Sequence, residues 1–89
     1  MLAHVIVSGR VQGVGFRFSA RQQADQYNLT GWVQNKSDGT VELEVEGSKD
    51  GVHAFLNDLK EGLNPAIKVD DMKVDTQQDE KGYSSFSIR

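Results

Sequence analysis

The stretch TVELEVE, residues 40–46, decides the fold of this 89-residue chain. Valine and leucine alternate with glutamate, which is the period of a β-strand with one apolar face. The turn signal Ser37-Asp38-Gly39 lies just before it and follows a second extended run at Thr30–Lys36. The two runs predict an antiparallel hairpin. Its apolar side chains are expected to face a core, and its outer face is expected to be exposed and acidic, with Glu42, Glu44 and Glu46.

A strand and a helix are predicted before this hairpin. Residues 2–8 are rich in β-branched side chains, which is typical of a strand buried on at least one face. From Phe16 to Asn28 the apolar residues recur at helical spacing, with polar residues opposite. The glycines between the strand and Phe16 prevent a regular element there.

A helix and two strands are predicted after the hairpin. Ser48 is a good N-cap, an apolar stripe at helical spacing follows it, and Gly62 ends the helix. Ile67–Thr76 is typical of a long strand, but its apolar pattern slips at Asp70-Asp71, which indicates a bulge. Ser84–Ile88 is predicted to form a short last strand.

The predicted order is therefore β-α-β-β-α-β with a short terminal strand, in a single domain over residues 1–89. Two split βαβ units of this kind form an antiparallel sheet with both helices on one face, an α+β sandwich of the ferredoxin-like type. Right-handed crossovers leave few other arrangements. Because this fold hosts many activities, the function has to be inferred from particular residues.

Composition excludes several classes of protein. The chain has no cysteine, so it has neither disulfides nor a thiolate metal site, and its formal net charge of −3 argues against a general nucleic-acid binder. No apolar run reaches membrane-spanning length, and the N-terminus lacks the features of a signal peptide. We therefore expect a cytoplasmic, monomeric protein that binds neither nucleic acid nor membranes.

The stretch GRVQGVGFR, residues 9–17, contains two arginines but no acidic, histidine, cysteine, lysine or serine side chain. Gly13 and Gly15 permit backbone angles that point successive N–H groups into one concavity, and a helix starting at Phe16 adds the unpaired N–H groups of its first turn. Arg17 can add a planar fork that matches two phosphate oxygens. These features fit a phosphate-sized anion. A purely structural strand-to-helix turn would explain the same glycines.

Two longer motifs contain or accompany these residues. The first is VSGRVQGVGFR, residues 7–17, and the second is GWVQN, residues 31–35, followed by GTV at residues 39–41 and by Gly47. They resemble the two signatures of the acylphosphatases at every defining position and at the spacing of that family. The resemblance covers essentially the whole chain and implies the βαββαβ fold.

The resemblance also implies a reaction and its residues. The expected reaction is hydrolysis of a small-molecule acyl phosphate to a carboxylate and inorganic phosphate, with no metal or other cofactor. Arg17 matches the arginine that clamps phosphate oxygens, and Asn35 matches the asparagine that orients the attacking water. Gln12 is expected to act through its backbone and not its side chain. The backbone N–H groups that would hold the phosphate are those of Gln12, Gly13, Val14, Gly15 and Phe16.

Two alternatives to an enzyme follow from the same sequence. Domains of this type also occur inside larger proteins that handle carbamoyl phosphate, so one alternative is an acyl- or carbamoyl-phosphate-binding module without significant turnover. The other is a purely structural ferredoxin-like domain, which would leave both motifs unexplained. The presence of both Arg17 and Asn35 favours the enzyme.

Several other polar residues are expected to pack or to face solvent. His4 and His53 have no carboxylate or second ligand nearby in the sequence, and the two residues of Asp70-Asp71 face opposite sides of a strand. No metal or acid–base site is therefore expected from them. Arg10 and Arg21 either steer anions towards the loop or only keep the surface soluble.

Overall fold

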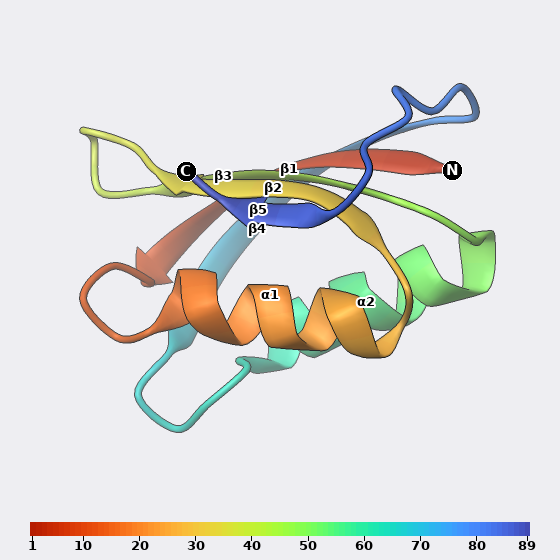
Figure 1. The fold of residues 1–89 in the computed structure, drawn as a ribbon. Helices are drawn as coiled ribbons and strands as arrows, with labels where there is room; N and C mark the ends of the chain where they lie inside the picture. Colours follow the sequence, from red (N-terminus) through yellow and green to blue (C-terminus); the bar gives the residue numbers. More distant parts are fainter.

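The computed structural model describes residues 1–89, which form one sheet with both helices on the same face (Figure 1). The strand order in the sheet is β4-β1-β3-β2-β5. The predicted α+β sandwich of the ferredoxin-like type is confirmed. In chain order the elements are β1 (Leu2–Arg10), α1 (Phe16–Gln26), β2 (Thr30–Asn35), β3 (Val41–Glu46), α2 (Lys49–Glu61), β4 (Lys68–Gln77) and β5 (Phe86–Ile88).

The four long strands pair antiparallel, as predicted, whereas β5 pairs parallel to β2, so the complete sheet is mixed. Because β4 and β5 lie at opposite edges, the segment between them has to cross the sheet. Residues 78–85, hereafter the strap, cross on the face opposite the helices (Figure 1).

The hairpin of β2 and β3 forms at the predicted turn. Gly39 has a φ of +91°, a conformation that favours glycine. Asp38 Oδ1 accepts hydrogen bonds from the Thr40 backbone N–H at 3.0 Å and from its hydroxyl at 2.6 Å. These bonds lower the pKa of Asp38. The turn thereby fixes the register in which Asn35 lies opposite Val41.

The core lies between the sheet and the helices. The inward residues of β3 are buried as predicted, and the buried side chains of α1 and α2 are Phe16, Ala20, Ala24, Val52, Phe55 and Leu59. Ser48 caps α2 by accepting a hydrogen bond from the Gly51 N–H at 3.1 Å. α1 ends at Gln26, two residues earlier than predicted, because Asn28 takes a left-handed conformation with φ 57°.

The predicted bulge in β4 is confirmed and has a partner on β1. Ser8 pairs with Asp71 while Gly9 pairs with Val69, which leaves Asp70 as the extra residue. A Cβ on Gly9 would lie 2.3 Å from the Lys68 carbonyl oxygen. Only a glycine therefore permits this close approach, at the point where β1 leads into the glycine-rich loop.

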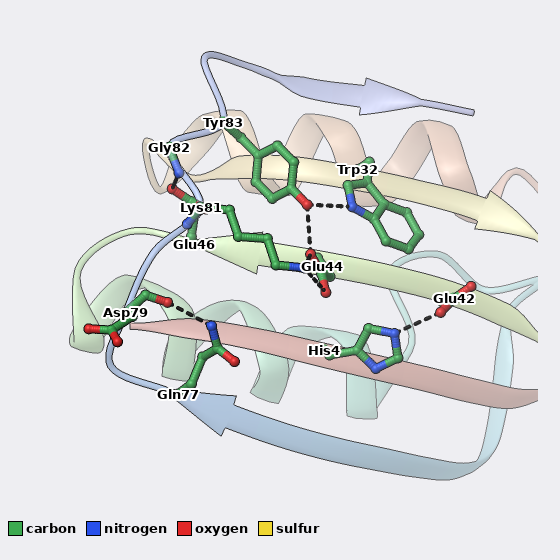
Figure 2. Close-up of polar contacts among 10 residues, drawn as sticks. All are labelled: His4, Trp32, Glu42, Glu44, Glu46, Gln77, Asp79, Lys81, Gly82 and Tyr83. Carbon is green, nitrogen blue, oxygen red and sulfur yellow. Dashed lines mark hydrogen bonds and ion pairs between the residues drawn. The ribbon is translucent and has the colours of Figure 1, made fainter.

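The prediction of an exposed acidic face on β3 is wrong for two of its three glutamates. Glu44 and Glu46 are only 6% and 3% exposed because the strap covers them. Glu46 accepts hydrogen bonds from the N–H groups of Lys81 and Gly82 at 2.9 and 3.0 Å, and Glu44 accepts from Lys81 Nζ and from the Tyr83 hydroxyl (Figure 2). Burial alone would raise the pKa of Glu44, but these two hydrogen bonds outweigh it and lower the pKa.

Candidate active site

Residues 11–15 form the loop that joins β1 to α1. Gly13 and Gly15 have φ values of +74° and +76°, so both need the left-handed conformation that glycine adopts readily. Apart from the neighbouring residues in the chain, nothing lies within 4 Å of the position that a Cβ on Gly13 would occupy. Left-handed residues in such a loop turn N–H groups towards one side, where they form a concavity suited to an anion.

The N-terminus of α1 adds further donors to this loop. Its N-cap is Gly15, no side chain caps it, and its first turn contains no acidic residue. The Ser19 N–H donates to the Gly15 carbonyl oxygen at 3.0 Å. The N–H groups of the preceding residues in the first turn have no acceptor inside the helix, and the positive end of the helix dipole lies beside them.

Arg17 lies in the first turn of α1 and is held from the far end of the chain. Its Nη1 donates a hydrogen bond to the main-chain oxygen of Arg89 at 3.3 Å. Arg89 is itself fixed on β2: its N–H donates to the Val33 carbonyl oxygen at 2.8 Å, and its guanidinium lies 4.4 Å from the centroid of the Trp32 ring. No sequence pattern predicted this contact, which spans 72 residues.

Gln12 connects the loop to the hairpin that carries Asn35. Its side-chain Nε2 donates to the carbonyl oxygens of Lys36 and Thr40, both at 2.8 Å. The expectation that Gln12 acts only through its backbone is therefore wrong, because both N–H bonds of its amide hold the turn. Asn35 is the exposed last residue of β2, directly before that turn.

Asn64, from the connection between α2 and β4, also holds the loop before α1. Its Nδ2 donates to the Val14 carbonyl oxygen at 3.1 Å and to the Ser19 hydroxyl at 3.2 Å. The sequence did not predict a role for this residue. The Asn-Pro pair at residues 64–65 signals only a turn, and nothing local indicates a contact 50 residues away.

These elements surround one cavity of about 220 Å³. In Figure 1 the loop, the β2–β3 turn and the end of the chain lie at the same end of the molecule. The side chains of Gln12 and Val14 are not part of the lining. The cavity is lined by Val11, Gly13, Gly15, Phe16, Arg17, Phe18, Asn35 and Ile88. Five of the seven predicted site residues are therefore brought together.

Phe18 and Ile88 were also missed, although Phe18 has a signal in the sequence. It follows Phe16 by two residues and so falls outside the buried stripe of α1, where an aromatic residue is unexpected. Ile88 has no such signal, because its position depends on the parallel pairing of β5 with β2.

The remaining candidates lie outside the cavity. His4 Nε2 contacts Glu42 Oε2 at 2.7 Å on the open face of the sheet (Figure 2). This hydrogen bond lowers the pKa of Glu42, against a smaller opposing effect of burial. His53 and Arg10 are exposed, and neither lines the cavity.

Comparison with known proteins decides the family. The family model described as Acylphosphatase matches residues 3–88. The chain belongs to the acylphosphatase family. An acylphosphatase of Bacillus licheniformis is 45% identical over 84 residues, which are 94% of this chain and 92% of that protein. The family membership predicted from the two motifs is confirmed.

Solved structures agree with this acylphosphatase assignment. The crystal structure of acylphosphatase from Bacillus subtilis has a TM-score of 0.93 and 42% identity, and the match covers 100% of this chain and 99% of that one. The structure of T. kodakarensis HypF matches with a TM-score of 0.85 and 31% identity, over 100% of this chain but only 12% of that one. The acylphosphatase fold therefore also occurs as a small part of a longer protein.

This acylphosphatase has neither a membrane-spanning helix nor a cluster of metal-ligating side chains. None of its helices has the length and apolar character needed to cross a membrane. It brings together no group of three or more histidine, aspartate or glutamate side chains that could hold a metal ion.

Proposed function

We propose that the cavity beside α1 is where this chain hydrolyses acyl phosphates to a carboxylate and inorganic phosphate. Membership of the acylphosphatase family supports this reaction. The observation that carries the proposal is the convergence of Gly13, Gly15, Arg17 and Asn35 on one cavity. These residues come from a loop, a helix and a hairpin, and together they supply what transfer of a phosphoryl group to water requires.

The first requirement is an electrostatic clamp on the phosphoryl oxygens. In the proposal, the N–H groups of residues 12–16 hold the phosphate. Arg17 adds two parallel N–H donors in a geometry that a lysine cannot supply. Because the donors are fixed before substrate binds, they stabilise the transferring phosphoryl group without reorganising. The main-chain oxygen of Arg89 supports this role by holding the guanidinium beside the cavity.

The second requirement is a positioned nucleophile. We assign this role to Asn35, whose amide can accept a hydrogen bond from water through its oxygen and donate one through its nitrogen while remaining neutral. An aspartate at this place would repel an anionic substrate. The two hydrogen bonds of Gln12 to the turn support this role because they fix the distance between Asn35 and the loop.

The third requirement, departure of the leaving group, needs no protein acid. An acyl phosphate releases a carboxylate, which is a weak base, so placing the water in line and stabilising charge is sufficient. The attacking water still releases a proton, and we assign its acceptance to the substrate phosphate. A pH–rate profile showing an enzyme base with a pKa near 6–7, abolished by replacing one carboxylate or histidine, would contradict this assignment.

The test is release of phosphate from benzoyl phosphate by purified protein in the presence of EDTA. We expect metal-independent turnover, and losses of roughly 10²–10³-fold in kcat/KM for Arg17→Lys and Asn35→Ala. The loss should fall mainly on KM for Arg17→Lys and mainly on kcat for Asn35→Ala. Arg10→Lys and Asn57→Ala change exposed residues outside the cavity and should leave kinetics unchanged. Near-normal activity of either cavity variant would remove that residue from the mechanism.

The second candidate is a module that binds acyl or carbamoyl phosphate without significant turnover. The observation that favours it is the match to a small part of HypF. Competitive binding of inorganic phosphate without release of phosphate from benzoyl phosphate would support this candidate over the enzyme.

We also propose that the protein acts as a monomer in the cytoplasm. A chain of this size with a complete cavity needs no partner residue for the proposed mechanism. Sedimentation equilibrium at assay concentration should give the mass of one chain, and cell fractionation should recover the activity with cytoplasmic markers.

A further inference from the structure

Two exposed apolar side chains line the cavity. The exposed large apolar residues of the chain are Phe18 at 52%, Val74 at 41% and Ile88 at 37%. Single exposed apolar residues are ordinary. Phe18 and Ile88, however, come from elements 70 residues apart and line the same cavity as Arg17 and Asn35. Exposed apolar surface that converges on a polar site marks a place for an apolar part of a ligand.

The cavity is too small to enclose a large substrate. Its volume of about 220 Å³ lies below the roughly 300–1,000 Å³ typical of pockets that enclose drug-sized ligands. Two of the residues that line it, Val11 and Phe16, are each only 1% exposed. In the proposed function, the loop and Arg17 hold the phosphate, which leaves the apolar lining residues Phe18 and Ile88 for the group attached to it.

We propose that Phe18 and Ile88 form a subsite for the acyl group of the substrate, and that this subsite favours aromatic and branched apolar acyl groups over small or charged ones. The inference rests on the proposed function, because it takes the phosphate to be bound by the loop and Arg17. It adds a substrate class that the phosphate-binding residues do not determine.

Both side chains are held on regular elements, as a specificity subsite requires. Phe18 lies on α1, where the guanidinium of Arg21, one turn further along, lies 5.5 Å from the centroid of its ring. This cation–π contact restrains the ring, and Phe18 is still 52% exposed with Arg21 in place. Ile88 is fixed opposite Val33 by the pairing of β5 with β2.

The experiment compares kcat/KM for benzoyl phosphate with kcat/KM for acetyl phosphate. The acetyl group offers only a methyl, whereas the benzoyl ring can lie against Phe18 and Ile88. In Phe18→Ala and in Ile88→Ala, the benzoyl-to-acetyl ratio should fall by about three- to tenfold, because each variant removes part of the apolar contact. Phe18→Tyr keeps the ring and should keep the wild-type ratio.

Val74→Ala is the matched control, because Val74 is similarly exposed but lies on β4 outside the cavity. It should leave the ratio unchanged. The inhibition constant of inorganic phosphate should also stay within about twofold in Phe18→Ala, which shows that the loop itself is intact.

The outcomes separate the two claims. A wild-type protein that hydrolyses both compounds, with a ratio that neither Phe18→Ala nor Ile88→Ala changes, overturns the subsite and leaves the proposed function standing. A ratio that falls equally in Val74→Ala also overturns the subsite. A wild-type protein that hydrolyses neither compound overturns the proposed function and the subsite with it.

Discussion

Two glycine-containing loops lie at opposite ends of the sheet (Figure 1). One binds a carboxylate of the chain, and the other borders a cavity without an acidic side chain. In the strap, Gly82 has a φ of +80°, and the N–H groups of Lys81 and Gly82 donate to the carboxylate of Glu46. In the loop before α1, Gly15 has a φ of +76°, and no acidic side chain lines the cavity beside it.

The comparison shows that one arrangement of backbone N–H groups can serve either structure or ligand binding. Where the chain supplies its own carboxylate, the N–H groups fasten the strap to the sheet. Where the chain supplies an arginine and a neutral amide instead, the same arrangement suits an anion from outside. The presence of glycine does not distinguish a structural loop from a binding loop; the charge of the side chains around the concavity does.

The largest effect is expected from giving the loop before α1 an anion of its own. Gly15→Asp should lower kcat/KM for benzoyl phosphate by at least about 100-fold, because a carboxylate at the N-cap would compete with and repel the substrate phosphate. Gly15→Asn is the matched control, since asparagine has the same shape, tolerates the left-handed conformation equally and is neutral. Equal kinetics for the two variants would contradict the electrostatic explanation.

The next effect tests the strap. Glu46→Gln should lower the free energy of unfolding by about 2 kcal/mol, because two backbone N–H groups lose an ionised acceptor. Urea denaturation measures it, and Glu61→Gln, at the exposed end of α2, should stay within about 0.5 kcal/mol of wild type. A change of that small size in Glu46→Gln would mean that the strap is held by other contacts.

A smaller effect should come from loosening the loop without changing its charge. Asn64→Ala removes the donor to the Val14 carbonyl and should reduce kcat/KM by about tenfold, through weaker binding of phosphate. The inhibition constant of inorganic phosphate should rise in parallel. Asn57→Ala on α2 is the control, and an unchanged inhibition constant in Asn64→Ala would show that Asn64 does not position the loop.

The smallest effect concerns the pH dependence of the strap. The folded-state pKa of Glu44 is lowered, so its contribution to stability is complete above the unfolded value of about 4.3 and is lost as the pH falls through the folded value. Glu44→Gln should therefore destabilise the protein at pH 7 and progressively less below pH 4. Denaturation curves from pH 3 to pH 7 measure this, and a difference independent of pH would contradict it.

Local sequence patterns were sufficient to predict the main helices and strands. The alternation in β3, the turn at Gly39, the cap at Ser48 and the slip at Asp70 each depend on residues a few positions apart, and each is confirmed. The cause of the bulge, however, is visible only in the structure, because Gly9, which lies opposite it, belongs to another strand.

The features that could not be predicted from the sequence depend on contacts between residues far apart in the chain. Glu44 and Glu46 look like exposed strand residues until the strap, about 35 residues later, returns across them. In the same way, Gln12, Asn64 and Arg89 reach the site through hydrogen bonds between distant segments. Such contacts leave no pattern in the sequence. Arg17 and Asn35, in contrast, lie in continuous motifs that can be recognised from the sequence.

The most direct test of the central claim is a titration of the ¹⁵N-labelled protein with inorganic phosphate, followed by amide chemical shifts. If the loop before α1 is the phosphate site, the N–H signals of residues 12–17 should shift together and saturate. The signals of Lys81 and Gly82 should not move, because Glu46 already occupies them. Shifts confined to other residues, or an unchanged spectrum at saturating phosphate, would contradict the account.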